Sequence, residues 1–143
     1  MNLLDANDQP GQYPPSWYAA TTQFLPPFTS FDGVDDTDIC IIGAGYTGLS
    51  AALHLANQGC TVTLLEAQRV GFGASGRNGG QLGSGQRLDQ ETLLRWLGPQ
   101  SADALWDLAE EAIDCSKSLI KQHNIDCFLK PGIAELGFSN SDK

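Results

Sequence analysis

Positive charge is scarce in this chain of 143 residues. It carries 8 Lys and Arg against 17 Asp and Glu, a formal net charge of −9. Such a balance repels polyanions, so we expect neither nucleic acid nor an anionic membrane surface as a partner. The first basic residue is Arg69. Secretory signals and transit peptides need positive charge near the N-terminus, so a cytoplasmic location is expected.

Long apolar runs and closely spaced cysteine pairs are also missing. No run approaches the roughly 20 apolar residues of a membrane-spanning helix, so no membrane span is predicted. No two cysteines form a C-x-x-C pair, which disfavours a zinc site and thioredoxin-type chemistry, and we expect no metal. A free cysteine behaves as a small hydrophobic residue. We therefore predict reduced packing residues at Cys40, Cys60, Cys115 and Cys127.

Proline is concentrated in residues 1–37, which hold five of the seven prolines. Proline lacks an amide proton and fixes φ, so neither a helix nor a central strand is expected there. The same segment contains six large aromatic residues, which a wholly solvated tail rarely carries. We predict an N-terminal extension that lies along a folded body, or alternatively docks onto a partner chain. Among these aromatic residues are Trp17, Tyr18, Phe24, Phe28 and Phe31.

From residue 38 the pattern is strand, helix, strand. Residues 38–43 form an apolar run typical of a strand buried on both faces of a parallel sheet. Residues 46–58 have apolar positions at helical spacing, and residues 61–66 are β-rich. Together they predict a right-handed, parallel βαβ unit. The expected fold class is α/β, with a Rossmann-type βαβ unit and its following loop over residues 38–97.

Residues 98–143 are expected to form a further helix and the beginning of a second domain. A short helix over 90–97, with Asp89 as its cap, precedes a break at Gly98-Pro99. Residues 101–123 form an amphipathic pattern whose apolar positions include Leu105 and Leu108. Residues 127–138 predict two short strands joined at Pro131-Gly132. These strands would begin an antiparallel sheet that stays incomplete, and the resemblance to a known family, carried by the glycine motifs, implies that this sheet belongs to a substrate domain.

The glycine pattern G-x-G-x-x-G follows the first predicted strand and opens the first helix. In that context it predicts a dinucleotide site, because the middle glycine lets the backbone approach a pyrophosphate at the positive end of the helix dipole. Glu66 ends the second strand, where an acid accepts hydrogen bonds from ribose hydroxyls and repels the 2′-phosphate of NADP. The alternative is a βαβ turn without a ligand. The motif comprises Gly43, Ala44, Gly45, Tyr46, Thr47 and Gly48.

A second glycine-rich stretch, GFGASGRNGG, occupies residues 71–80. No acidic residue lies between Glu66 and Asp89, whereas Arg69, Arg77 and Arg87 do, so a local positive field is expected there. An NAD-dependent dehydrogenase does not need such a loop. FAD extends past its pyrophosphate to a ribityl chain and a flavin, and a loop of bare backbone crossing it would serve that longer ligand.

The two motifs together resemble those of FAD-dependent oxidoreductases of the D-amino-acid oxidase and glycine oxidase superfamily, and most closely its γ-glutamylputrescine oxidase group. YTGLSAALHLA, GFGASGRNGGQ and the SWYAAT segment carry this resemblance. It implies that Gly43 to Gly48 bind the pyrophosphate, that Glu66 binds the adenosine ribose with Ala67 also at the cofactor, and that Arg77 pairs with a phosphate or holds the loop. It also implies that several loop residues line the FAD: Ala74, Ser75, Asn78, Gly79, Gly80 and Gln81.

The resemblance further implies a reaction: the flavin accepts two electrons from a C–N bond of a small amine or amino acid, and water hydrolyses the resulting imine. His54 and His123 are not expected to be catalytic. Because members of the superfamily are several hundred residues long, we expect an N-terminal portion of such an oxidase that retains FAD weakly or not at all and turns over little alone. The alternatives are an NAD-dependent dehydrogenase and a non-catalytic remnant that binds a nucleotide or a partner.

Overall fold

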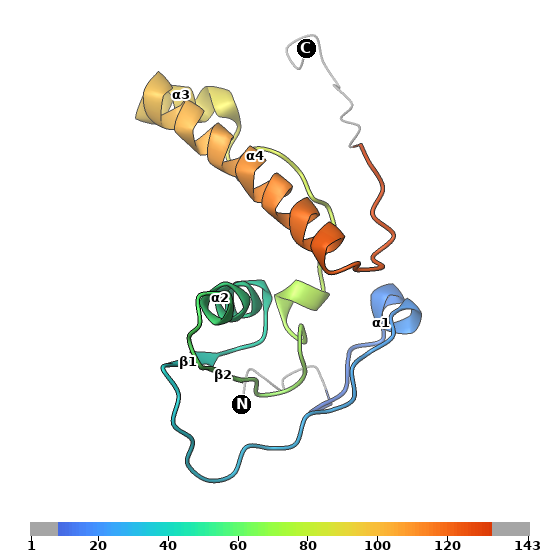
Figure 1. Cartoon of the computed structure of the whole chain (residues 1–143). Helices are drawn as coiled ribbons and strands as arrows, with labels where there is room; N and C mark the ends of the chain where they lie inside the picture. Colours follow the sequence, from blue (N-terminus) through green and yellow to red (C-terminus); the bar gives the residue numbers. More distant parts are fainter. Residues whose placement is uncertain (1–8, 133–143) are drawn as a thin grey trace. The chain divides into compact units, whose positions relative to one another are not determined.

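The computed structural model of the chain describes residues 9–132, which divide into two compact units after Gly79 (Figure 1). The first unit contains helix α1 (Trp17–Thr21), strand β1 (Ile39–Ile42), helix α2 (Tyr46–Asn57), strand β2 (Val62–Leu65) and a 3-10 turn at Ala74–Gly76. The second contains helices α3 (Gln90–Leu97) and α4 (Pro99–Gln122). The described residues therefore form a mixed helix and strand structure.

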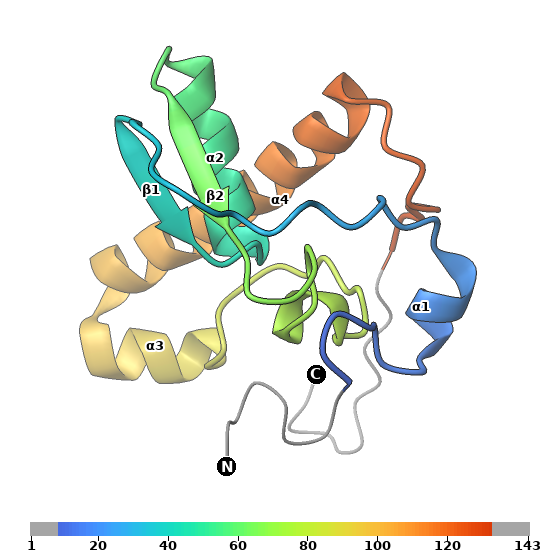
Figure 2. The same ribbon diagram turned by 90° about the horizontal axis from the view of Figure 1, so that it is seen from below.

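The first unit contains the predicted βαβ arrangement. β1 and β2 pair in parallel, with Ile39 opposite Val62 and Ile42 opposite Leu65. α2 contacts both strands, and Figure 2 shows it running alongside them. The predicted bounds of each of these three elements differ from the observed bounds by at most two residues. The agreement is close because each element is recognised from the spacing of apolar residues within it.

The prediction that β1 is buried on both faces is wrong. Its residues alternate between half-buried and exposed, and Ile42 is 79% exposed. The unit has two strands and one crossover helix, so only one face of the sheet is covered by α2. The buried side chains of the unit are instead Ala44 and Phe72. Its best-packed region is thus the turn after β1 and the loop beside it.

The cysteines are free thiols, as predicted, but most are not packing residues. Cys40, Cys115 and Cys127 are exposed, and Cys60 is half-buried. Cys40 lies on the uncovered face of β1, which explains its exposure.

The N-terminal extension contains a helical turn that its proline content did not predict. α1 lies between the pairs Pro14-Pro15 and Pro26-Pro27 and contains no proline itself. Its start is capped by Ser16, whose Oγ accepts a hydrogen bond from the Ala19 amide at 3.1 Å. The expectation that the extension lies along a folded body is met, because several of its residues bond to residues 68–70.

The second unit follows its predicted helices closely. Asp89 caps α3 by accepting a hydrogen bond from the Thr92 amide at 2.8 Å, and Gly98, with φ of +77°, separates α3 from α4. α3 and α4 contact each other, and the buried residues of the unit are Leu93, Ala102, Ala109 and Ile113. Leu108, expected on the apolar face of the second helix, is 57% exposed instead.

The predicted strands at residues 127–138 are not seen where the structure describes them. Residues 127–132 form no strand, and residues 133–138 lie outside the described residues. Two strands of this length need a partner surface to be stable, and periodicity alone does not supply one. Within residues 9–132, no helix has the length and apolar character required to cross a membrane.

Asp38 joins the starts of the two strands through hydrogen bonds to Thr61. Its Oδ2 accepts hydrogen bonds from the Thr61 amide and the Thr61 hydroxyl, both at 2.8 Å. The backbone hydrogen bond from Thr61, followed by that from its side chain, lowers the pKa of Asp38 below its ordinary value of 3.8. A lowered pKa means that the stabilisation is present above 3.8 and is lost as the pH falls through the folded-state value.

We therefore expect Asp38→Asn to lower the urea midpoint of unfolding near neutral pH and to have less effect once the pH falls below 3.8. Urea titrations across that range measure the difference. Asp36→Asn is the matched control, because Asp36 makes no hydrogen bond with another described residue. A difference between Asp38→Asn and the unmodified chain that did not change with pH would contradict the role of the charged carboxylate.

Candidate dinucleotide-binding site

The turn from β1 into α2 depends on glycine at two positions. Gly43 has φ of +101°, a conformation that side chains disfavour, and its amide donates to the carbonyl of Leu65 at 2.7 Å. At Gly48, a Cβ would overlap the carbonyl oxygen of Gly43 and lie 3.3 Å from Cγ2 of Ile41. The close helix–strand approach predicted for Gly48 is therefore present in the structure.

The first amides of α2 and of the turn before it point to anion binding. The Tyr46 amide donates to Ser75 Oγ at 2.9 Å. The amides of Gly45 and Thr47 have no acceptor among residues 9–132. Gly45 is the N-cap residue of α2 and offers no side chain to satisfy them. Unpaired amides at the positive end of a helix dipole attract phosphate and carboxylate groups.

Glu66 connects the two turns that follow β1 and β2. Its Oε2 accepts a hydrogen bond from the Ala44 amide at 2.7 Å, and its Oε1 accepts one from the Gln68 amide at 3.0 Å. Sequence reasoning gave this residue a ribose-binding role and missed its bond to the glycine turn. A carboxylate has about four acceptor positions, so two positions remain for further donors.

The glycine-rich loop lies directly beside the first glycine turn. The Gly71 amide donates to the Ala44 carbonyl at 2.8 Å, and Gly71 has φ of +70°. A Cβ at Gly76 would overlap the carbonyl oxygen of Gly71. The loop's own tight folding thus requires bare backbone at these two positions, in addition to any close approach of a ligand.

Arg77 holds the loop through its backbone and a buried ring. Its Nε donates to the Phe72 carbonyl at 2.9 Å, and its guanidinium carbon lies 4.8 Å from the centre of the Phe72 ring. These contacts favour the loop-holding role over phosphate pairing. Asn78 closes the other end of the turn, because its Nδ2 donates to the carbonyls of Ala74 and Ser75 at 3.1 and 2.9 Å.

The structure brings together one group of the predicted residues: the glycine turn 43–48, Glu66, Ala74, Ser75, Arg77 and Asn78. Ala67 and Gly79 are exposed and form no hydrogen bond among the described residues. Gly80 and Gln81 are exposed residues at the start of the second unit.

Sequence reasoning missed the contacts that Tyr13 makes with Phe24 and Arg69, and its hydrogen bond to Val70 just before this loop. The aromatic content of the extension was the one signal for them. His54 lies exposed on α2, and His123 lies exposed at the end of α4. In the described part of the chain, no three His, Cys, Asp or Glu side chains are grouped to hold a metal ion.

Comparison with known proteins gives consistent matches. Residues 38–142 match the model of the DAO family, described as FAD-dependent oxidoreductases. The chain is 43% identical to gamma-glutamylputrescine oxidoreductase of Escherichia coli over 82% of its own length and 28% of that protein. It is 44% identical to the Rhizobium meliloti protein named "Probable oxidoreductase OrdL", over 88% of the chain and 29% of that protein.

A more distant relative is glycine oxidase of Bacillus licheniformis, which is 32% identical over 74% of the chain and 27% of that protein. The chain therefore spans between a quarter and a third of the length of these relatives. No solved structure gives a significant match.

Proposed function

The chain belongs to the DAO family of FAD-dependent oxidoreductases, and from this premise we propose that it binds FAD at the turn between β1 and α2. The observation that carries the proposal is the pair of unpaired amides at Gly45 and Thr47, which lie at the start of α2. They would donate hydrogen bonds to the diphosphate. Glu66 would accept bonds from the adenosine ribose with its two remaining acceptor positions.

The residues of the turn fit such a group. Gly45 has no side chain, so its amide and that of Thr47 are open to a ligand, and the nearest side-chain atom to a Cβ built there is Ser75 Oγ at 3.0 Å. The loop carrying Ala74, Ser75 and Asn78 would run beside the ribityl and flavin part. Ala67 and Gly79 complete the proposed lining within the first unit. Arg77 would hold the loop in place through its contacts with Phe72.

The substrate class follows from the relatives and is a proposal for the whole protein. The names of two relatives specify γ-glutamylputrescine and glycine as their substrates. Bound FAD supplies a two-electron acceptor, and we propose that the electrons come from a C–N bond of an amine or amino acid. The described residues contribute to this reaction by binding and orienting the cofactor. No proton-transferring residue is assigned among them.

An NAD-dependent dehydrogenase is the alternative that the first glycine turn alone would permit. Loop 71–79 disfavours it, because the loop lies against the turn through the Gly71–Ala44 and Tyr46–Ser75 hydrogen bonds. A nicotinamide dinucleotide does not need a second backbone segment that crosses the ligand. The loop therefore favours the longer flavin dinucleotide.

Titration of the chain with FAD, FMN, NAD and ADP distinguishes the proposed FAD site from the NAD site of a dehydrogenase. We expect FAD to bind more tightly than NAD, ADP to compete with FAD, and FMN, which lacks the adenosine and the diphosphate, to bind most weakly. Because the described first unit has one uncovered sheet face, we expect the FAD affinity of this chain to be low. Equilibrium dialysis at high nucleotide concentration measures all four. NAD binding as tight as FAD binding would refute the flavin assignment.

A further inference from the structure

We propose that part of the N-terminal extension is a clamp that holds the glycine-rich loop in its cofactor-binding conformation. The clamp consists of Gly11, Tyr13, Phe24 and Leu25, and Tyr13 and Arg69 are its positioning residues. Its effect on the cofactor rests on the function proposed above, whereas its effect on the loop does not.

Hydrogen bonds tie the clamp to the chain on both sides of Arg69. The Gly11 amide donates to Oε1 of Gln68, and the Tyr13 hydroxyl donates to the Val70 carbonyl at 2.7 Å. These bonds connect residues separated by 57 positions in the sequence. They therefore bring the extension onto the segment that leads from β2 into the loop.

Arg69 reaches back to the clamp in the opposite direction. Its Nη2 donates to the Leu25 carbonyl at 2.7 Å, and its guanidinium carbon lies 5.0 Å from the centre of the Tyr13 ring. A cation over an aromatic face adds electrostatic attraction to the hydrogen bond. Arg69 thereby contacts both parts of the clamp, at Tyr13 and at Leu25, two residues before the loop begins.

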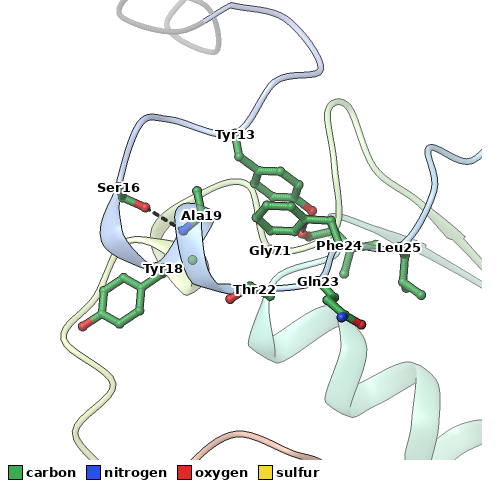
Figure 3. Close-up of a pocket in the computed structure, with 11 residues that line it drawn as sticks. Tyr13, Ser16, Tyr18, Ala19, Thr22, Gln23, Phe24, Leu25 and Gly71 are labelled. Carbon is green, nitrogen blue, oxygen red and sulfur yellow. Dashed lines mark hydrogen bonds between the residues drawn. The ribbon is translucent and has the colours of Figure 1, made fainter.

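Aromatic stacking gives the clamp its shape. The rings of Tyr13 and Phe24 are stacked, with centroids 3.8 Å apart and planes inclined by 12°, and Figure 3 shows them face to face beside Gly71. The Tyr13 ring also lies 6.5 Å from that of Phe72, which is buried. The carbonyl of Phe72 accepts the hydrogen bond from Arg77 Nε. Through the Phe72 ring, the clamp therefore contacts a residue whose hydrogen bond with Arg77 holds the loop together.

The clamp is connected to the dinucleotide turn through the backbone of residues 70 and 71. Val70, held by Tyr13, precedes Gly71, whose amide bonds to the Ala44 carbonyl. A loop with glycines at 71, 73, 76 and 79 has high conformational freedom, so ordering it at the moment of ligand binding would cost affinity. A clamp that orders the loop beforehand removes part of that cost without touching the ligand.

The clamp depends on a few contacts and is not a continuous packed interface. A cavity of about 280 Å³ lies between the extension and the loop, lined by Tyr13, Ser16, Phe24, Gly71 and Gly76 among others (Figure 3). The attachment is therefore made by the hydrogen bonds to residues 68–70 and by the contact between the Tyr13 and Phe72 rings. Single substitutions at these contacts should therefore release the loop.

Hydrogen exchange of the full chain without ligand tests the clamp. In Tyr13→Ala we expect the amides of Gly71 and Phe72 to exchange about tenfold faster, because a hydrogen bond and a ring stack are lost. The amides of β1 and β2 should stay unchanged. Tyr13→Phe keeps the ring stack and should show a smaller increase. Phe28→Ala is the matched control, because Phe28 is a 76% exposed aromatic of the same extension.

Titration of the same variants with FAD tests the positioning role. We expect Tyr13→Ala to lower FAD affinity, by at most the factor by which it accelerates loop exchange, because affinity scales with the fraction of chains whose loop is already ordered. Tyr13→Phe should rescue most of the loss, and Phe28→Ala should show no change. If no variant and not even the unmodified chain binds FAD, the proposed function fails, and the exchange result alone decides the clamp.

Unchanged exchange at Gly71 and Phe72 in Tyr13→Ala would overturn the clamp. Faster exchange with undiminished FAD affinity would overturn the positioning role. Should Tyr13→Ala also accelerate exchange in β1 and β2, Tyr13→Phe decides, because it removes only the hydroxyl that bonds to Val70. Equal loop exchange in Tyr13→Phe and the unmodified chain would then count against the clamp.

Discussion

FAD affinity is expected to fall by about 10- to 100-fold in Gly45→Val. A branched side chain at this position would stand before the amides of Gly45 and Thr47 and keep the diphosphate away from them. Hydrogen bonds to charged groups contribute about 1.5–3 kcal/mol, and each tenfold change in affinity corresponds to about 1.4 kcal/mol. Equilibrium dialysis of the variant against FAD measures the loss.

The fold of Gly45→Val should survive, which makes the effect specific to the ligand. Gly45 has φ of −86° and ψ of −175°, an extended conformation that valine adopts readily. The added Cβ lies 3.0 Å from Ser75 Oγ, which rotates away only by giving up its hydrogen bond from the Tyr46 amide, so circular dichroism of the variant checks that the unit stays folded. Ser50→Val, at an exposed position of α2, is the matched control. Unchanged FAD affinity in Gly45→Val would show that the diphosphate lies elsewhere.

Gly48→Ala is expected to destabilise the first unit by about 1–3 kcal/mol, the range for overpacking of a close contact, or to prevent its folding. The added Cβ would overlap the backbone carbonyl of Gly43, which is fixed by the turn and cannot rotate away. Helix propensity alone predicts the opposite sign, because alanine is favoured over glycine in a helix by about 1 kcal/mol. Urea denaturation followed by circular dichroism measures the change.

The sign of the stability change in Gly48→Ala shows whether helix–strand packing or helix propensity dominates at this position. Ser50→Ala, on an exposed position of the same helix, should leave stability unchanged or slightly raised. A Gly48→Ala chain as stable as the unmodified one would mean that α2 does not approach β1 as closely as the structure shows.

Local signals in the sequence were enough to predict the βαβ unit and the two later helices. Apolar spacing marks α2 and α4, and the Asp89 side chain, three residues from the Thr92 amide, identifies the start of α3. Glycine at 43 and 48 was assigned by its position between a strand and a helix, and both carry the geometry expected of them. These features depend on residues that are neighbours in the sequence.

Features that depend on distant residues were not predicted. Whether Cys40 and Ile42 are buried depends on what covers the second face of β1, and an apolar run is the same in either case. The bonds of Tyr13 and Gly11 cross 57 positions, and no spacing rule relates such residues. The hydrogen bond from the Ala44 amide to Glu66 likewise depends on how closely the two turns approach each other.

The most direct test of the account is an amide-resolved NMR titration of the full chain with FAD and with ADP, which detects weak binding. We predict that both ligands shift the Gly45 and Thr47 resonances and saturate together with those of the Glu66 region, and that FAD alone also shifts loop residues 74–78. If the Gly45 and Thr47 amides stay unshifted while other residues respond, or if nothing responds at saturating ligand, the diphosphate is not bound at this turn.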